Sequence, residues 1–208
     1  MESFFEDLIK PKKKKPQQLR QLYQIPKKDK GDNMPRIQRV EPNIYQQADL
    51  LFLPNDKGYK YALTVVDVGN DQADAEPLKT KEQDEIIKAF ETIYKRGYIN
   101  YPKVMQVDSG KEFGSKVKNF FKSNNIGYRV AQVGRHRQQA KVERWNQIIG
   151  TLLMKRMSAQ ELLTEKTSRA WVQDLPALIR VLNRRKKEEL GLKLMKEPDN
   201  RLKCEGDN

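Results

Sequence analysis

The chain has 208 residues, of which 41 are Lys or Arg and 28 are Asp or Glu, giving a net charge of +13 at pH 7. This length suits one domain plus extensions, and the basic balance favours a polyanionic partner such as DNA. The single cysteine, Cys204, and the single histidine, His136, exclude an internal disulfide and a zinc finger. No apolar run reaches the ~18 residues of a membrane span, and no signal peptide is visible. The sequence therefore predicts an intracellular protein with no membrane partner.

The first 44 residues are basic and interrupted by proline. Hydrophobic residues make up only 37% of the chain, which predicts extended or disordered ends around a compact middle. The run Lys12, Lys13, Lys14 and Lys15 fits a nuclear import signal or a nonspecific contact with phosphates, and a solvated tail is the alternative.

From Tyr45 the pattern alternates between strands and helices. Apolar and β-branched runs predict strands over 49–53, 59–68, 73–78, 104–107 and 128–131. Apolar residues at helical spacing predict helices from an N-cap at Thr80 to a stop at Gly97, over 115–124, from Val142 to Leu152, and over 169–188. Pro176 is expected to bend or interrupt the last helix. This order predicts an α/β fold, with a mixed five-stranded sheet that has helices on both faces.

Three carboxylates lie where predicted elements begin or end. Asp49 opens the first strand, Asp108 ends the fourth on a Ser-Gly turn, and Glu143 comes early in a helix after 34 intervening residues. Two Mg²⁺ or Mn²⁺ ions roughly 3.5 to 4 Å apart activate phosphodiester transfer, and Mg²⁺ takes oxygen ligands. We expect Asp49 to bridge both ions, Asp108 to complete one and Glu143 the other. Asp67 is a rival for Asp49, and Glu112 is a rival for Glu143.

These residues carry a resemblance that covers Tyr45 to Met157. The segment resembles the catalytic core of retroviral-type integrases, which have a D,D-35-E motif on an RNase H-like fold. The match rests on Asp49, on the D-x-G-x-E-F pattern of Asp108, Gly110, Glu112 and Phe113, and on Gln139, Glu143 and Asn146. The basic lead-in and the run Tyr-Gln-Gln-Ala-Asp-Leu resemble the integrases of Polinton/Maverick transposons, virophages and large DNA viruses.

The resemblance implies a DNA integrase or transposase. Such an enzyme nicks DNA ends and then joins the freed 3′-hydroxyls to target DNA, with no covalent protein intermediate. The resemblance also implies that Gln139 and Asn146 contact substrate or steady the metal site, while Lys141 and Arg144 reach phosphates. The lysines that the family carries one and two turns beyond its Glu are absent, because Gln147 and Gly150 stand there.

The family further implies double-stranded DNA as partner, both the element ends and the target, and a homodimer or larger multimer. We expect an arm over 1–44, a catalytic core over 45–188 and a charged tail over 189–208, in a protein of the host nucleus, a viral factory or a virion. Two other functions stay open. One is an RNase H-like nuclease without strand transfer, and the other is a non-catalytic DNA-binding protein derived from an integrase.

Overall fold

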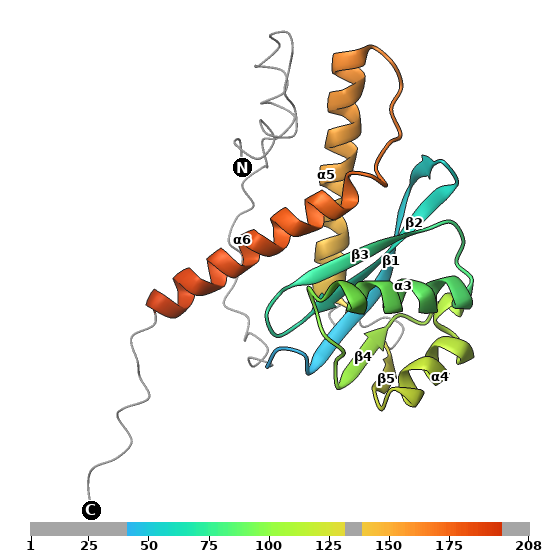
Figure 1. Ribbon diagram of the computed structural model, residues 1–208, viewed down its shortest axis with the longest axis vertical. Coiled ribbons are helices and arrows are strands. Elements are labelled where there is room, and N and C mark those ends of the chain that lie inside the picture. Colours follow the sequence, from blue (N-terminus) through green and yellow to red (C-terminus); the bar gives the residue numbers. More distant parts are fainter. Residues whose placement is uncertain (1–40, 132–138, 197–208) are drawn as a thin grey trace, which may run out of the picture.

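A five-stranded mixed sheet with helices on both faces forms the body of the protein (Figure 1). The computed structural model describes residues 41–131 and 139–196, without the side chains of residues 190 and 192–196. Its strands are β1 (Tyr45–Asp56), β2 (Tyr59–Asp67), β3 (Ala73–Leu78), β4 (Val104–Val107) and β5 (Gly127–Val130). Its helices are α3 (Gln83–Arg96), the short 3₁₀ helix η1 (Lys111–Phe113), α4 (Ser115–Ser123), α5 (Ala140–Thr164) and α6 (Leu175–Lys196). The predicted fold class is confirmed.

The strands lie in the order β3-β2-β1-β4-β5. The first three are antiparallel neighbours, whereas β4 pairs in parallel with β1, and β5 in parallel with β4. The β1–β2 turn passes through Lys57 and Gly58, both with positive φ, a conformation that glycine adopts at little cost. The parallel additions need helical crossovers, and α3 and α4 supply them.

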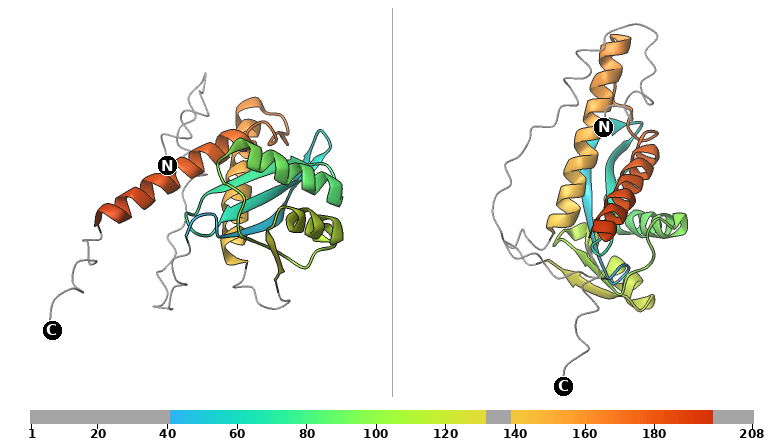
Figure 2. Two further views of the ribbon diagram at one scale, coloured as in Figure 1. Left: turned by 60° about the horizontal axis from the view of Figure 1, so that its bottom comes forward. Right: turned by 90° about the vertical axis from the view of Figure 1, so that its left-hand side faces the viewer.

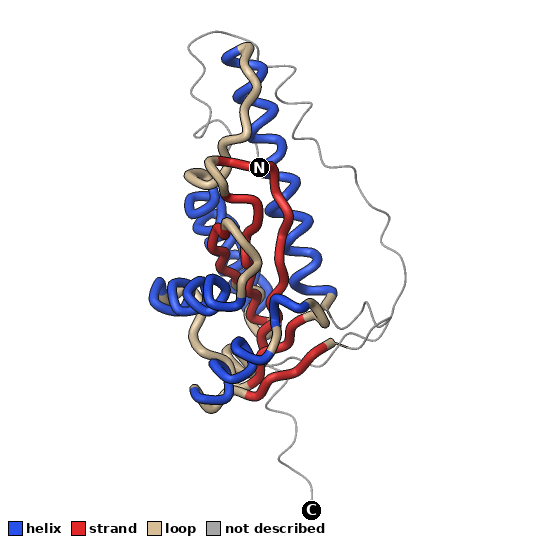
Figure 3. Tube along the Cα trace, turned by 90° about the vertical axis from the view of Figure 1, so that its right-hand side faces the viewer, coloured by secondary structure: helices blue, strands red, loops and turns tan. Residues whose placement is uncertain are grey.

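Two hydrophobic clusters lie on opposite faces of the sheet because side chains alternate along each strand. One packs Leu63 and neighbouring strand residues against Phe90 of α3 and Phe121 of α4. The other packs Val66 and its neighbours against Trp145 of α5 and Trp171, which precedes α6. The two views of Figure 2, and the tube in Figure 3, show α5 standing on one side of the strands and α3 on the other.

Two predicted helix boundaries were wrong. Glu82 is the N-cap of α3 instead of Thr80, whose backbone N–H and hydroxyl bind the carboxylate of Glu85. Pro176 neither bends nor interrupts α6, because the helix begins at Leu175 and proline is tolerated in a first turn. The predicted stop of α3 at Gly97 is confirmed, with φ 75° at that residue.

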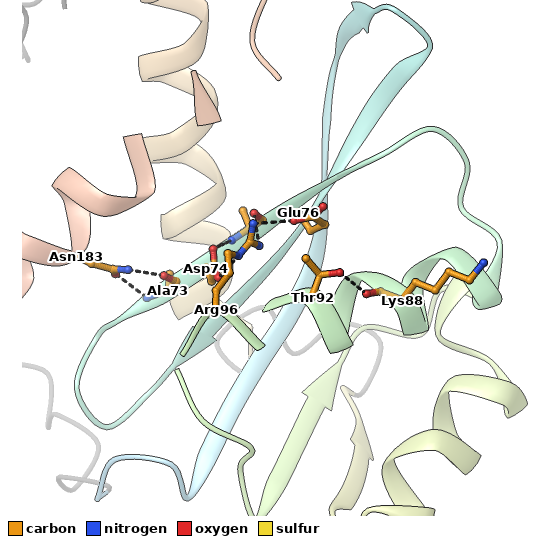
Figure 4. Close-up of polar contacts among 8 residues, drawn as sticks. Ala73, Asp74, Glu76, Lys88, Thr92, Arg96 and Asn183 are labelled. Atoms are coloured by element: carbon orange, nitrogen blue, oxygen red, sulfur yellow. Dashed lines mark hydrogen bonds and ion pairs between the residues drawn. The ribbon is translucent and has the colours of Figure 1, made fainter. Parts of the chain in front are cut away.

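Side chains occupy the outer edge of β3 (Figure 4). The Asn183 amide of α6 accepts the Ala73 N–H at 2.9 Å and donates to the Ala73 carbonyl at 2.7 Å. The Ala75 carbonyl accepts from Arg96 of α3 at 3.0 Å, while the Ala75 N–H donates to the neighbouring Asp74 carboxylate at 2.7 Å. Arg96 also pairs with Asp74 and Glu76. Pro77 has no N–H, so the outward donors of this edge are bonded or absent.

Both long helices extend past the sheet. The second half of α5 runs beyond the end of β1 and β2, and α6 leaves the body on the β3 side (Figure 1). Across the described residues, no helix has the length and apolar character needed to cross a membrane.

Candidate active site

Asp49 lies in the middle of β1, and not at the beginning of a strand as predicted. The parallel register pairs Ala48 with Val107, the last residue of β4. The residues that follow this pair are Asp49 on β1 and Asp108 after β4. Because neighbouring strands lie about 4.8 Å apart, the two acids are near each other. Asp49 therefore lies inside β1, but it is level with the point where the neighbouring strand β4 ends.

The turn after β4 holds the second acid. Asp108 accepts the Gly110 N–H at 3.0 Å, which closes a short turn of a kind that Asp side chains favour. The buried Phe113 anchors η1, and its carbonyl accepts from the Tyr128 hydroxyl of β5 at 2.5 Å. Glu112 folds over Gly110, where a Cβ would lie 2.6 Å from the Glu112 Cδ, so a larger residue at this position would displace the Glu112 carboxylate.

The first turn of α5 brings the third acid to the same face of the sheet. Glu143 is the fourth residue of α5 and its side chain is exposed. Asn146, one turn later by the spacing of a helix, donates to Asp49 Oδ2 at 2.9 Å. The Val142 N–H donates to the buried Gln47 Oε1 at 3.2 Å. Two contacts with β1 therefore bracket Glu143.

The electrostatics of Asp49 reflect this gathering of acids. The pKa of Asp49 is raised to about 6, chiefly by burial; the carboxylates of Asp108 and Glu143 add to this rise, and the hydrogen bonds with Leu50 and Asn146 oppose it. Burial, followed by the charge of Asp108, also raises the pKa of Tyr128 above its usual range. The carboxylates of both other predicted ligands therefore lie near enough to affect the ionisation of Asp49.

The donor set fits a hard divalent cation. Carboxylate oxygens suit Mg²⁺ and Mn²⁺, and the mutual repulsion of the three acids is the kind of charge excess that a cation relieves. Within residues 41–131 and 139–196, no three His, Cys, Asp or Glu side chains already lie close enough to hold a metal ion. A metal site made by Asp49, Asp108 and the exposed Glu143 would therefore require these side chains to move closer together.

The other predicted DNA-binding residues that the structure describes lie near the start of α5. Gln139 is buried, and neither polar atom of its amide has a hydrogen-bond partner among the described residues. Lys141 pairs with Asp71 of the β2–β3 turn at 2.5 Å, and Arg144 is exposed. Lys12, Lys13, Lys14 and Lys15 lie outside the described residues, as does His136.

Comparisons with known proteins identify the fold. No protein-family model matches the sequence, and no curated protein has a sequence similar to it. A chain of the simian T-cell lymphotropic virus intasome, solved in complex with the PP2A regulatory subunit B56 gamma, shares 23% identity with a TM-score of 0.54. The match covers 63% of this chain and 48% of that one, so this chain matches about half of its length. This is an integrase-like, RNase H-like fold.

Two structures of the HTLV-2 integrase catalytic core domain in complex with magnesium also match. The trimeric form shares 24% identity with a TM-score of 0.48, and the dimeric form 25% with a TM-score of 0.47. Both matches cover 58% of this chain and 75% of the other.

In this integrase-like fold, the rival acid on β2 has a structural task. Asp67 is fully buried at the end of β2, and its carboxylate accepts the backbone N–H groups of Asn43, Gly69 and Asn70. Those bonds tie the β2–β3 turn to Asn43, which lies just before β1, and they occupy the Asp67 carboxylate. Asp49 is therefore the better candidate.

Sequence reasoning missed several residues that shape the site. Gln47 lies two residues before Asp49 on the same strand face, and that spacing is the one local signal for it. Gln83 at the start of α3 donates to the Lys111 carbonyl at 3.3 Å and accepts the Lys116 N–H at 2.9 Å. Nothing local in the sequence indicates this contact, nor that of Tyr128, because both join distant segments.

Proposed function

We propose that this protein is a DNA integrase or transposase that nicks DNA ends and joins their 3′-hydroxyls to target DNA by metal-assisted transesterification. One observation carries the proposal. The β1–β4 register places Asp49 beside Asp108, and Asn146 of α5 is bonded to Asp49 one turn from Glu143. Asp49, Asp108 and Glu143 thus come from three elements that meet at one region of the sheet, and this arrangement supports a metal site on an integrase-like fold.

The three acids are the proposed ligands of two Mg²⁺ or Mn²⁺ ions. Asp49 would be shared between both ions, with Asp108 on one and Glu143 on the other. When bound, the ions supply activation of the attacking oxygen and stabilisation of the leaving oxygen. No nucleophilic side chain is needed, because water or a DNA 3′-hydroxyl is the nucleophile.

Neighbouring side chains support this chemistry. The Asn146 amide holds Asp49 Oδ2 in place, and its second polar atom, Oδ1, is buried without a partner in the described part of the chain. Gln139, Lys141 and Arg144 lie at the N-terminal end of α5, where backbone N–H groups favour anions. We propose that they contact DNA phosphates, with Lys141 exchanging Asp71 for phosphate when DNA binds.

The same proposal extends to the rest of the chain. Residues 45–188 would be the catalytic core, 1–44 a basic arm whose Lys12 to Lys15 contact DNA, and 189–208 a charged tail. A homodimer or larger multimer would hold two DNA ends, in a host nucleus, viral factory or virion. The relationship to Polinton/Maverick, virophage and large-virus integrases is part of this proposal.

The deciding experiment is an assay with labelled linear duplex carrying the element's own ends, in Mg²⁺ or Mn²⁺. We expect the wild type to give nicked and joined products, and Asp108→Asn and Glu143→Gln to give neither. Asp84→Asn is the matched control, because it removes an exposed acid that pairs with Lys116 on the other side of the sheet. Glu112→Gln should retain activity.

Each other outcome has a separate meaning. Nicking without joining that needs both Asp108 and Glu143 would favour a nuclease. DNA binding without turnover would leave a binding protein. A loss in Glu112→Gln as deep as that in Glu143→Gln would replace Glu143 with Glu112 as the third ligand.

A further inference from the structure

The start of α5 takes its cap from a distant strand. The first N–H groups of any helix lack partners within the helix, and a side chain at the N-cap usually binds one of them. The N-cap of α5, Gln139, makes no such bond. Instead, Gln47 Oε1 on β1 accepts the Val142 N–H at 3.2 Å, across 95 residues of sequence.

This bond belongs to a pair that ties α5 to β1. Gln47 and Asp49 are two residues apart on one strand face, a rise of about 6.7 Å. Val142 and Asn146 are four residues apart on α5, about one turn or 6 Å. The matching spacings allow both contacts, Gln47 to Val142 and Asp49 to Asn146, to form together. Glu143 directly follows the first anchored residue.

We propose that Gln47 is a positioning residue, which sets the separation between Glu143 and Asp49 that divalent cation binding requires. The inference rests on the function proposed above. Gln47 does not touch the reacting atoms; it acts through the backbone of Val142. It is buried beside Gln106, its partner in the β1–β4 register, so two uncharged amide side chains lie next to each other here. A neutral amide gives the helix its acceptor without adding a fourth negative charge.

A matched control lies next to it in the chain. Gln46 is also buried, but it faces the opposite side of the sheet, where it accepts from the Tyr94 hydroxyl at 2.9 Å and donates to the Asn100 carbonyl at 2.7 Å. Gln46→Met and Gln47→Met remove the same amide from neighbouring positions of one strand. Both should lower stability, but only Gln47→Met should change the geometry of the acids.

The test measures Mn²⁺ binding by electron paramagnetic resonance, together with amide hydrogen exchange at Val142, on the full chain without DNA. We expect Gln47→Met to weaken Mn²⁺ binding 10- to 100-fold, the usual effect of removing a group that orients a metal ligand. Val142 should lose protection from exchange. Gln46→Met should change the affinity for Mn²⁺ by less than about 3-fold, which is smaller than the weakening expected for Gln47→Met. Gln47→Asn, whose amide is one methylene shorter, should also weaken binding and replaces Gln47→Met if the latter does not fold.

Failure of this inference can be told apart from failure of the proposed function. Unchanged Mn²⁺ affinity in the Gln47 variants, or an equal loss in Gln46→Met, would overturn the positioning role while Asp108→Asn still abolished binding. Wild-type protein that binds no Mn²⁺, or binding that Asp108→Asn does not weaken, would overturn both.

Discussion

Asp49 is where stability and the proposed activity conflict. Its raised pKa means that the folded protein holds a proton on this carboxyl more tightly than the unfolded chain, whose Asp pKa is about 3.9. Folding is therefore favoured by this group below that value, and the contribution is lost as pH rises through about 6. At neutral pH, the ionised Asp49 carboxylate therefore lowers the stability of the metal-free protein.

We predict that Asp49→Asn stabilises the metal-free protein at pH 8 by about 1 to 2 kcal/mol, because it removes a carboxylate that burial and two neighbouring acids disfavour. The gain should shrink toward pH 5 and vanish near pH 4. Urea unfolding with a chelator at these pH values measures it, and added Mg²⁺ should stabilise the wild type but not Asp49→Asn. Asp84→Asn, which removes an exposed acid, should match the wild type both in stability at pH 8 and in its response to Mg²⁺. A variant less stable than wild type at pH 8 would contradict this account.

Local patterns in the sequence predicted the acids, whereas contacts between distant segments stayed hidden. Asp108 and its turn are encoded within six residues, from Asp108 to Phe113, and each strand reveals itself by its own apolar run. Gln47 and Val142 are separated by 95 residues, so their hydrogen bond depends on the whole fold. The sequence singles out Asp49 as a candidate ligand, but its place in mid-strand, level with the end of β4, depends on the sheet register, which the sequence does not show.

At the scale of elements, α6 is attached to the sheet by one amide as well as by apolar packing. Asn183 is buried and satisfies both backbone groups of Ala73 (Figure 4). Ahead of it, Leu175, Leu178 and Ile179 fill the cluster around Trp171. The apolar positions were visible in the sequence as a helical stripe, but an asparagine in a helix gives no sign that it binds a strand edge.

We predict that Asn183→Leu lowers the free energy of unfolding by about 2 to 4 kcal/mol, since it leaves a buried N–H and a buried carbonyl without partners. Chemical denaturation measures the loss, and exchange of the Ala73 amide should rise. Arg184→Gln is the control on the same helix, because its exposed side chain makes only a 4.0 Å ion pair with Glu188. Equal losses in the two variants would mean that the amide does not anchor α6.

For the whole molecule, the net charge of +13 predicts DNA binding that weakens steeply with salt. Arg144→Gln should weaken binding and reduce the slope of log K against log salt by about 1, because one phosphate contact is lost. Fluorescence anisotropy with a labelled duplex measures both. Lys118→Gln removes the same charge from an exposed position on α4, on the other side of the sheet, and should leave the slope unchanged. The same change in both variants would show that total charge, and not the start of α5, governs binding.

The bonded edge of β3 restricts how copies of this chain can gather on a polyanion that concentrates them. An unpaired strand edge can form backbone hydrogen bonds with the edge strand of another copy, and repeated pairing of this kind produces fibres. Here Asn183, Asp74 and Arg96 already occupy the backbone groups that such growth would use, and Pro77 offers no donor. Copies that meet on this side must therefore fit together through side chains, and that kind of contact can close into a complex of fixed size.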